Sequence, residues 1–368
     1  MKKLFVFIPA ILLVLFLLNS FVVKEKEAKK QPIKEGKSAV IANIIFKSTD
    51  GGQTWQDISK GLPEKLQKES VWAYGFFTND RGFYLRAGNG VYHNEPNSTT
   101  SFWTKEMFPG KQRNIAPGRS GLFAYDFRGQ FLQKINGTSN WSPMYTDFQK
   151  QAVRLNGTKD DWMYKNFKEK FVSTVFETER GTVFIGSNNS LFRSTDSGKT
   201  WKQVNDGNGT MKLTESNGVL LATSKEGILR STDDGENWDR VISEGGVGIA
   251  VEHIDGGFAA IVKNTITQTN SIHISMDSGK TWNAIAEDLQ PSRTSLLMKK
   301  IGLLQSSSEI LSIKQMGKYL ICGRSDGIFR SSDMGKTWQQ LLLPATENFG
   351  FNLSVSGNVL YVIPNKGC

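Results

Sequence analysis

The chain has 368 residues, with 45 lysines and arginines against 35 aspartates and glutamates, and a formal net charge of +10. Its first 30 residues hold six lysines and two glutamates, so a surplus of only +6 belongs to the rest; this mild balance, without an arginine-rich stripe, excludes nucleic acid as the expected partner. The three histidines, His93, His253 and His273, lie far apart without paired cysteines, so we expect no metal and no other cofactor.

The N-terminus has the pattern of an export signal. Two lysines precede an apolar run of 20 residues from Leu4 to Val23, and a charged stretch follows it. The run is long enough to span a bilayer, and it has no small-x-small cleavage site. We therefore predict a signal peptide or signal anchor over 1–30, a linker over 31–40 and one domain over 41–368. The domain is expected outside the cytoplasmic membrane, in the periplasm or at the cell surface, either anchored or secreted.

Five copies of one eight-residue motif dominate the rest of the chain. They are STDGGQTW at 48–55, STDSGKTW at 194–201, STDDGENW at 231–238, SMDSGKTW at 275–282 and SSDMGKTW at 331–338. Each follows a short apolar run, which predicts a strand, a tight turn and a second strand. The Ser hydroxyl and the Asp carboxylate can accept N–H groups of the turn, and the Gly allows a backbone conformation that other residues resist.

This turn chemistry accounts for the motif without catalysis. We interpret its carboxylates as structural, and we expect its tryptophans to lie inside, with the indole N–H reaching a carbonyl. The carboxylates are Asp50, Asp196, Asp233, Asp277 and Asp333, and the tryptophans are Trp55, Trp201, Trp238, Trp282 and Trp338.

The spacing of the tryptophans predicts seven repeats. A gap of 146 residues separates Trp55 from Trp201, and it holds two degenerate units that end at Trp103 and Trp141. The tail from residue 351 supplies two strands, and residues near 41–58 supply two more. We therefore predict an all-β fold: a seven-bladed β-propeller of four-stranded antiparallel blades, preceded by an N-terminal hydrophobic helix. Its last blade would combine N- and C-terminal strands, which leaves no open sheet edge.

The motif resembles the Asp-box, or bacterial neuraminidase repeat, of sialidases, sortilin-type receptors, some glycoside hydrolases and photosystem II assembly propellers. The resemblance implies that the motif lies on the turn between the third and fourth strands of a blade, away from any active centre. In blade count and in lacking catalytic residues the chain is most similar to the assembly propellers. Those proteins use a basic patch to hold a partner protein.

The turns between second and third strands would then lie on the opposite face, and six of the seven carry a cation. These are Arg86, Arg128, Lys225, Lys263, Arg324 and Lys366, against the acidic Asp126, Glu226 and Asp326. A ring of cations around a propeller mouth favours an anionic partner, so this face is the predicted site for a protein partner or an anionic glycan. The alternative is that basic residues are simply common in the exposed turns of a basic protein.

Three long insertions follow Trp55, Trp141 and Trp282 on the same face, where function often lies. The middle insertion contains Arg154, Trp162 and Tyr164, which either contact a ligand or pack a lid. The repeat alignment places Cys322 and Cys368 in neighbouring blades on different strands, which disfavours a disulfide between them.

Two functions remain open. The first is a non-catalytic exported or membrane-anchored propeller that binds a protein or an anionic ligand in assembly or recognition. The second is a sialidase-like glycoside hydrolase or another enzyme acting on polysaccharides. The resemblance to sialidases implies an Arg-Ile-Pro motif, which this chain lacks. A glycosidase would need two carboxyl groups about 5 to 9.5 Å apart. The candidates are Asp126, Asp160, Asp161 and Asp326.

Overall fold

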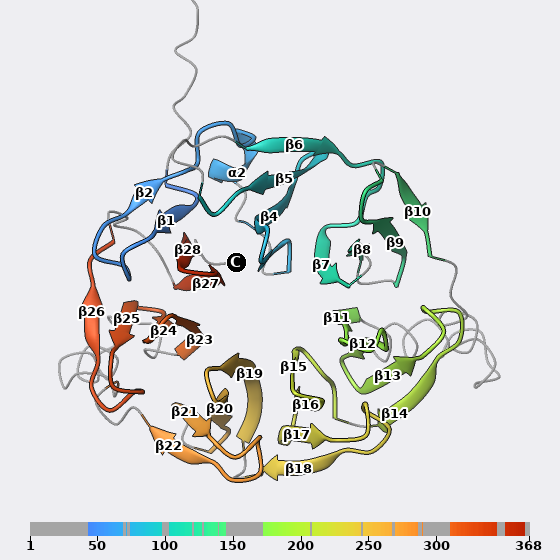
Figure 1. Ribbon diagram of the computed structural model, residues 1–368, viewed down its shortest axis with the longest axis vertical. Coiled ribbons are helices and arrows are strands. Elements are labelled where there is room, and N and C mark those ends of the chain that lie inside the picture. The colour runs from blue at the N-terminus through green and yellow to red at the C-terminus, as the bar shows by residue number, and fades with distance from the viewer. Residues whose placement is uncertain are drawn as a thin grey trace, which may run out of the picture. The chain divides into compact units, whose positions relative to one another are not determined.

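The computed structural model describes residues 43–68, 71, 74–97, 103–119, 121–126, 129–138, 140–144, 172–206, 208–243, 246–266, 269–285, 289, 310–343 and 350–364. Across these ranges the chain forms a ring of seven four-stranded antiparallel sheets (Figure 1), which confirms the predicted propeller. The predicted leader, its helix and the linker lie outside the described residues. Within the described ranges, no helix has the length and apolar character needed to cross a membrane.

Each blade contributes four strands, ordered from the central channel to the rim in Figure 1. Blade 1 contains β3 (Phe76–Asn79), β4 (Gly82–Ala87), β5 (Gly90–Asn94) and β6 (Thr104–Met107). Blade 2 contains β7 (Asn114–Gly118), β8 (Gly121–Tyr125), β9 (Phe131–Ile135) and β10 (Trp141–Pro143). Blade 3 contains β11 (Val172–Glu177), β12 (Val183–Ser187), β13 (Ser190–Ser194) and β14 (Lys202–Asp206). Blade 4 contains β15 (Leu213–Ser216), β16 (Val219–Ser224), β17 (Gly227–Ser231) and β18 (Asp239–Ile242).

The remaining three blades complete the ring. Blade 5 contains β19 (Gly246–Ile254), β20 (Gly257–Asn264), β21 (Thr269–Ser275) and β22 (Asn283–Ile285). Blade 6 contains β23 (Ile310–Met316), β24 (Tyr319–Arg324), β25 (Gly327–Ser331) and β26 (Gln339–Leu341). Blade 7 contains β27 (Phe351–Ser356), β28 (Val359–Pro364), β1 (Phe46–Ser48) and β2 (Gln56–Asp57).

Blade 7 closes the ring as the chain ends predict. Its strand order is β2-β1-β28-β27, so the two C-terminal strands lie inside the two N-terminal ones (Figure 1). Phe46 pairs with Val362 and Ser48 with Leu360 in the antiparallel register. This pairing gives the seventh sheet the same four strands as the others, and it covers the exposed edge that β28 would otherwise present.

The hydrophobic core lies between the blades. Seven clusters of buried side chains each join two adjacent sheets, one cluster for each of the seven blade interfaces. The second strands lie between neighbours on both faces, and β16 and β28 are accordingly buried along their whole length. Helix α2 (Lys65–Lys68) belongs to the first insertion, and Leu66 joins the cluster between blades 7 and 1.

Cys322 lies in β24 within the apolar cluster between blades 5 and 6 and carries a free thiol. Burial raises the pKa of this thiol to about 12. Cys368 lies outside the described residues.

Candidate functional site

The five motif turns share one hydrogen-bond pattern, and blade 4 shows it clearly. The Ser231 hydroxyl donates to Asp233 Oδ1 at 2.7 Å and accepts the Gly235 N–H at 2.9 Å. Asp233 Oδ1 also accepts the Asn237 N–H at 3.0 Å. Asp234 and Gly235 both have positive φ, 58° and 79°, so the turn needs a glycine at its second left-handed position. The Trp238 indole donates to the Gly235 carbonyl at 3.1 Å.

These hydrogen bonds keep the motif carboxyls ionised. Hydrogen bonds from the Thr200 N–H and hydroxyl lower the pKa of Asp196 to about 2. The Asn237 N–H lowers the pKa of the exposed Asp233 to about 2, against a smaller opposing effect of desolvation. Burial alone would raise the pKa of Asp50, but its hydrogen bonds with Thr54 and its neighbours bring it to about 2. The pKa values of Asp277 and Asp333 are lowered in the same way. A carboxyl in this state has no proton to donate at neutral pH.

The motif tryptophans are less uniform than their sequence pattern. Trp201 is buried, whereas the other four are half-buried. The indoles of Trp201, Trp282 and Trp338 donate to the carbonyl of their own motif glycine at 3.0 to 3.1 Å, as Trp238 does. The Trp55 indole N–H is buried and has no hydrogen-bond partner among the described residues.

The turns also tie each blade to its neighbour. Arg193 of β13, Arg230 of β17 and Arg330 of β25 lie one residue before the motif in their own blades. Each reaches the fourth motif residue of the next blade: Arg193 Nε donates to the Asp234 carbonyl at 2.8 Å, and Arg230 Nε to the Ser278 carbonyl at 2.8 Å. Arg330 Nη1 donates to the Gly51 carbonyl at 2.9 Å. We call these three residues the inter-blade arginines. They fill the space between blades on the motif face.

On the opposite face, Arg86 has internal partners. Its Nε donates to the Gln112 carbonyl at 3.0 Å and its Nη1 to the Gly88 carbonyl at 2.6 Å. The guanidinium stacks over the Phe108 ring at 4.3 Å. Burial, assisted by Arg113, lowers the pKa of Arg86. The side chain therefore holds the β4–β5 turn against the segment that leads into blade 2.

Arg324 is also bound internally, and it is 4% exposed. Its Nε and Nη2 each donate to one oxygen of Asp326 at 2.8 Å, a bidentate ion pair. Its Nη1 donates to the Leu289 carbonyl. The guanidiniums of Arg86 and Arg324 therefore both have structural partners within the protein. Their predicted role in binding an anion stays a prediction.

Lys225 differs because it is exposed. Its Nζ donates to Asn189 Oδ1 at 2.6 Å, which connects the β16–β17 turn of blade 4 to the β12–β13 turn of blade 3. The two turns border a pocket of about 450 Å³, which also contacts Gly209, Met211 and Val247. A lysine and side-chain amides at its edge supply donors and acceptors for a polar ligand. Lys263 lies half-buried in the next blade.

The other predicted ligand residues lie outside the described residues. These are Arg128, Lys366, Arg154, Trp162 and Tyr164, and with them the carboxylates Asp160 and Asp161. The two remaining carboxylate candidates belong to blades 2 and 6, which are not neighbours. Asp126 Oδ1 accepts the Gln130 N–H at 3.0 Å within its turn, and Asp326 is paired with Arg324.

A charge cluster that the sequence did not reveal lies on the inner strands of blades 4 to 6. Glu252 of β19 forms ion pairs with Lys314 of β23 and, at 3.6 Å, with Lys212 beside β15. Burial opposes ionisation of Glu252, but the two lysines hold its pKa below the ordinary value. Burial lowers the pKa of Lys314. The repeated motif does not point to these residues, because they lie on or beside inner strands, whose sequences are not repeated from blade to blade.

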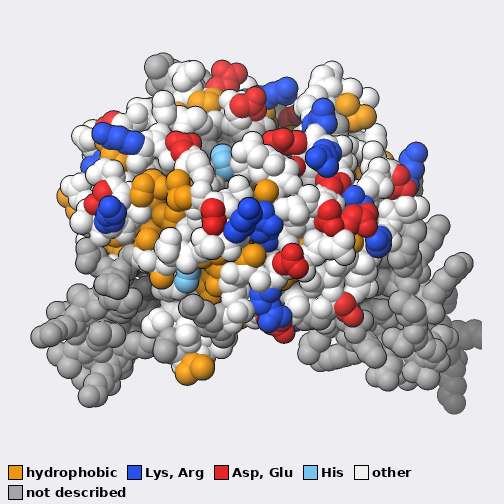
Figure 2. Space-filling view, turned by 60° about the horizontal axis from the view of Figure 1, so that its bottom comes forward, with side chains coloured by type: hydrophobic (Ala, Val, Ile, Leu, Met, Phe, Trp, Pro, Cys, Tyr) orange, Lys and Arg blue, Asp and Glu red, His pale blue; other side chains and the backbone are white. Residues whose placement is uncertain are grey.

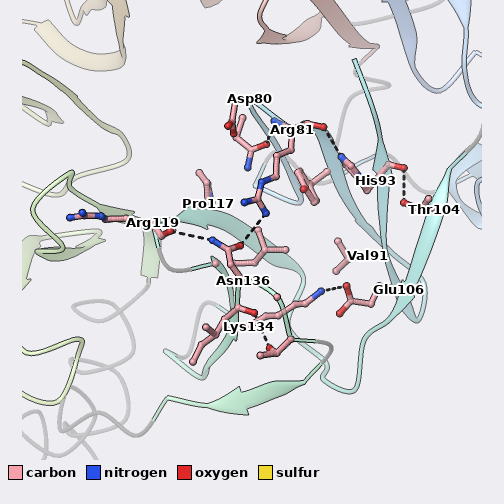
Figure 3. A pocket seen from close by; sticks show the side chains of 18 of the residues that line it. Asp80, Arg81, Val91, His93, Thr104, Glu106, Pro117, Arg119, Lys134 and Asn136 are labelled. Atoms are coloured by element: carbon pink, nitrogen blue, oxygen red, sulfur yellow. Dashed lines mark hydrogen bonds and ion pairs between the residues drawn. The ribbon is translucent and has the colours of Figure 1, made fainter. Parts of the chain in front are cut away.

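The outer surface carries both signs of charge. Figure 2 views the ring from the side of β18 and β22, and acidic and basic side chains alternate over it without a region of one sign. On this side of the ring, any attraction of an anion therefore depends on particular cations. Among the described pockets, a larger one of about 590 Å³ opens between blades 1 and 2 (Figure 3). None of its residues was a predicted ligand residue.

Comparisons with known proteins agree with this architecture. A family model described as BNR-Asp box repeat matches residues 191–204 and 328–341, and one described as BNR/Asp-box repeat matches residues 46–57. The curated vacuolar protein sorting/targeting protein 10 of Pyrenophora teres f. teres is 33% identical over 82 residues. That match covers 21% of this chain and 6% of the relative, so it concerns a small part of either protein.

Two solved structures are similar in fold. The GH74 xyloglucanase from Xanthomonas campestris superposes with a TM-score of 0.56 at 14% identity, over 85% of this chain and 56% of that one. An ancestral GH74 enzyme gives a TM-score of 0.52 at 13% identity, over 81% of this chain and 48% of that one. At such identities the likeness concerns the fold alone.

Proposed function

The chain is a seven-bladed β-propeller with BNR/Asp-box repeats, and from that premise we propose that it is a non-catalytic recognition protein. It binds an anionic ligand or a partner protein at the face formed by the turns between second and third strands. With the apolar run that precedes the domain, the proposal places this face outside the cytoplasmic membrane.

The observation that carries the proposal is the pocket beside Lys225. The lysine is exposed, and the β12–β13 turn of the neighbouring blade adds the side-chain amides of Asn188 and Asn189 to the pocket. Such a site provides one positive charge and several neutral hydrogen-bonding groups on a rigid scaffold. Among the described cations of the predicted ring, Lys225 is the exposed one, since Arg86 and Lys263 are half-buried and Arg324 is buried.

The motif carboxylates and the two described candidates, Asp126 and Asp326, support a role without catalysis. The five motif carboxylates are held in turns, and Asp126 and Asp326 also bind groups of their own blades. Hydrolysis of a glycosidic bond needs one carboxyl to give up a proton while another acts on the sugar. Nothing in these described carboxylates favours that arrangement.

The test is a charge reversal with a matched control. The full-length chain is purified from solubilised membranes as wild type, Lys225→Glu and Lys199→Glu, and the bound proteins and glycans are quantified. Lys199 is an exposed lysine on the motif turn of blade 3, so its reversal changes net charge equally on the other face. We expect one bound species to be lost with Lys225→Glu and retained with Lys199→Glu. Equal recovery from all three would refute the proposed face.

The competing proposal is a glycoside hydrolase. It is motivated by the fold likeness to two GH74 enzymes, which are hydrolases by their own description. Release of reducing sugar from neutral or acidic polysaccharides by the wild-type chain would support it and would contradict the non-catalytic role. The activity belongs to this chain if it co-elutes with the protein and if a substitution in the chain changes the pH profile of the activity, since a contaminating enzyme would keep its own profile.

A further inference from the structure

Blade 1, like blades 5 and 7, has no arginine at the position of the inter-blade arginines, where blades 5 and 7 carry Ile274 and Lys47. In blades 3, 4 and 6 the inter-blade arginine occupies one register position, since Arg193 pairs with Phe184, Arg230 with Leu221 and Arg330 with Ile321. In blade 1 the corresponding pair is His93 with Tyr84.

His93 remains within its own blade. Its ring stacks on the Tyr84 ring at 4.3 Å, with an interplanar angle of 17°. Its Nε2 hydrogen-bonds the Arg81 carbonyl at 2.8 Å. An arginine at this position would extend toward blade 2, as Arg193 extends toward blade 4. The shorter imidazole leaves that space open.

Blade 2 leaves its side of the gap open too. Its turn between third and fourth strands has Asn136 five residues before Trp141, where the motif has Asp. Asn136 Nδ2 donates to the Arg119 carbonyl at 3.3 Å, and Thr138 bonds back to the Ile135 carbonyl. The turn therefore folds on its own blade, and it does not supply the motif contact that blades 4, 5 and 7 offer to their neighbours.

The result is the pocket of about 590 Å³ shown in Figure 3. It is bordered by residues 79–81 of blade 1 and by residues 117–119, 121 and 135–138 of blade 2, which belong to turns of the motif face. It lies on the opposite side of the ring from the face proposed above, and it is independent of that proposal.

The pocket carries a surplus of positive charge. Arg81, Lys105, Arg119 and Lys134 line it, against Asp80 and Glu106. Two of these cations have firm internal partners: Lys134 is paired with Glu106, and Arg119 Nη1 donates to the Glu179 carbonyl. Glu106 is further held by the Trp141 indole at 3.1 Å.

Arg81 is the cation best placed for a ligand. Its side chain is exposed, and its Nη1 contacts Asn136 Oδ1 at 3.4 Å, at the long limit of a hydrogen bond. Figure 3 shows the guanidinium pointing across the pocket toward Asn136. Its planar fork can hold a carboxylate through two parallel hydrogen bonds. The hydroxyls of the exposed Thr104 and Thr138 donate to the His93 and Ile135 carbonyls and therefore offer lone pairs to a ligand, while the Asn136 amide has a second N–H to donate.

We propose that this pocket binds an acidic sugar, with the carboxylate of a uronic acid residue on Arg81 and the sugar hydroxyls on Thr104 and Asn136. A forked cation beside hydroxyl and amide groups, in a pocket with a positive surplus to which the exposed Lys105 contributes, matches one carboxylate on a ring of hydroxyl groups. The volume lies within the range of about 300 to 1,000 Å³ typical of small-ligand sites. Most of the side chains that line the pocket are polar or charged, and the apolar ones are Tyr84, Val91, Pro117, Leu122 and Ile135; this lining suits a polar ligand better than an apolar one.

The experiment uses the full-length chain in a detergent without sugar groups. Binding of a trigalacturonate, a neutral trisaccharide and triglutamate is measured by calorimetry and by saturation-transfer NMR. We expect the trigalacturonate to bind, and the other two probes to bind at least about tenfold more weakly. No binding of trigalacturonate to the folded wild type, or equal binding of the neutral sugar, would overturn the proposal. Stronger binding of triglutamate would assign the pocket to acidic peptides instead and would also overturn it.

Three variants and a control locate the site. Arg81→Gln should weaken trigalacturonate binding about tenfold, and Arg81→Lys should restore part of it by keeping the charge without the fork. Lys280→Gln removes one charge from an exposed turn of blade 5 on the same face and should leave binding unchanged. Thr104→Trp fills the pocket from β6 and should abolish binding in a folded protein. Wild-type affinity in Arg81→Gln or Thr104→Trp would refute the assignment.

Discussion

Replacing Arg193 by methionine tests whether the inter-blade arginines stabilise the ring. Arg193 binds blade 4 through its whole guanidinium: Nε donates to the Asp234 carbonyl at 2.8 Å, Nη2 to Asp234 Oδ2 at 2.8 Å, and Nη1 to Glu236 at 2.9 Å. Arg230, the matched comparison, reaches its neighbour through Nε, which donates to the Ser278 carbonyl at 2.8 Å. Methionine keeps most of the apolar stem in both cases, so the two variants differ mainly in the hydrogen bonds and ion pairs that each substitution removes.

The expected cost follows from burial. The Arg193 side chain is 11% exposed and Asp234 is 15% exposed, whereas Glu236 is 42% exposed. A hydrogen bond to a charged group contributes about 1.5 to 3 kcal/mol, whereas an exposed ion pair contributes about 0 to 1 kcal/mol. Asp234 keeps the Thr182 hydroxyl at 2.6 Å, which limits the penalty for its unpaired charge. We therefore expect a loss of about 3 kcal/mol for Arg193→Met and about 1.5 kcal/mol for Arg230→Met.

Urea unfolding followed by tryptophan fluorescence measures both variants against wild type. The midpoints should fall in the order wild type, Arg230→Met, Arg193→Met, with unchanged slopes, because the native surface is nearly the same. A loss below about 1 kcal/mol for Arg193→Met, or a loss no larger than that of Arg230→Met, would refute the reasoning. The motif turns would then stabilise each blade separately.

Three further outcomes are expected from the motif turn and the buried thiol. Ser231→Ala leaves the Gly235 N–H without its acceptor, and since Ser231 is 3% exposed the protein should lose about 1 to 3 kcal/mol in urea unfolding, whereas exposed Thr232→Ala should lose almost nothing. The pKa of Asp233 is about 2 in the folded chain against 3.8 ordinarily, so its stabilising effect is complete above pH 4 and is lost as the pH falls toward 2. Asp233→Asn should show a weaker decline over that interval, and an identical decline would contradict this assignment. In a Cys368→Ser chain, Cys322 should resist a maleimide at pH 8 until denaturant is added, because burial raises its pKa to about 12; rapid labelling of the native protein would contradict its burial.

The repeat count could be read from sequence because it depends on local chemistry. Each motif is a turn whose hydroxyl, carboxylate and glycine satisfy the backbone within eight residues, so its letters are visible without knowledge of the neighbours. The tryptophans at 103 and 141 served equally well as markers of the two blades that lack the motif. The closure of the ring by β27, β28, β1 and β2 could also be predicted, because the two strands at each end of the domain together make one complete four-stranded blade.

The site residues depended on distances that no local pattern encodes. Arg86 and Arg324 were selected for their place in exposed turns, yet the structure gives Arg86 the Gln112 carbonyl, and it gives Arg324 the Leu289 carbonyl and the Asp326 carboxylate. Their neighbours in the sequence do not reveal this, since Gln112 and Leu289 come from other segments. Lys225 kept its exposed position, and its contact with Asn189 arises only where two blades meet.

The turn motif, the number of blades and the joining of the two chain ends could therefore be predicted from the sequence alone, because they depend on local hydrogen bonding. The surfaces between blades were decided by tertiary structure, because each is built by residues of two repeats that the sequence separates by about one blade. The pocket beside Arg81 is the clearest case. It lies where blade 1 has a histidine at the position of the inter-blade arginines and where blade 2 faces it with a turn that lacks the motif, and these two features come together only in the assembled ring.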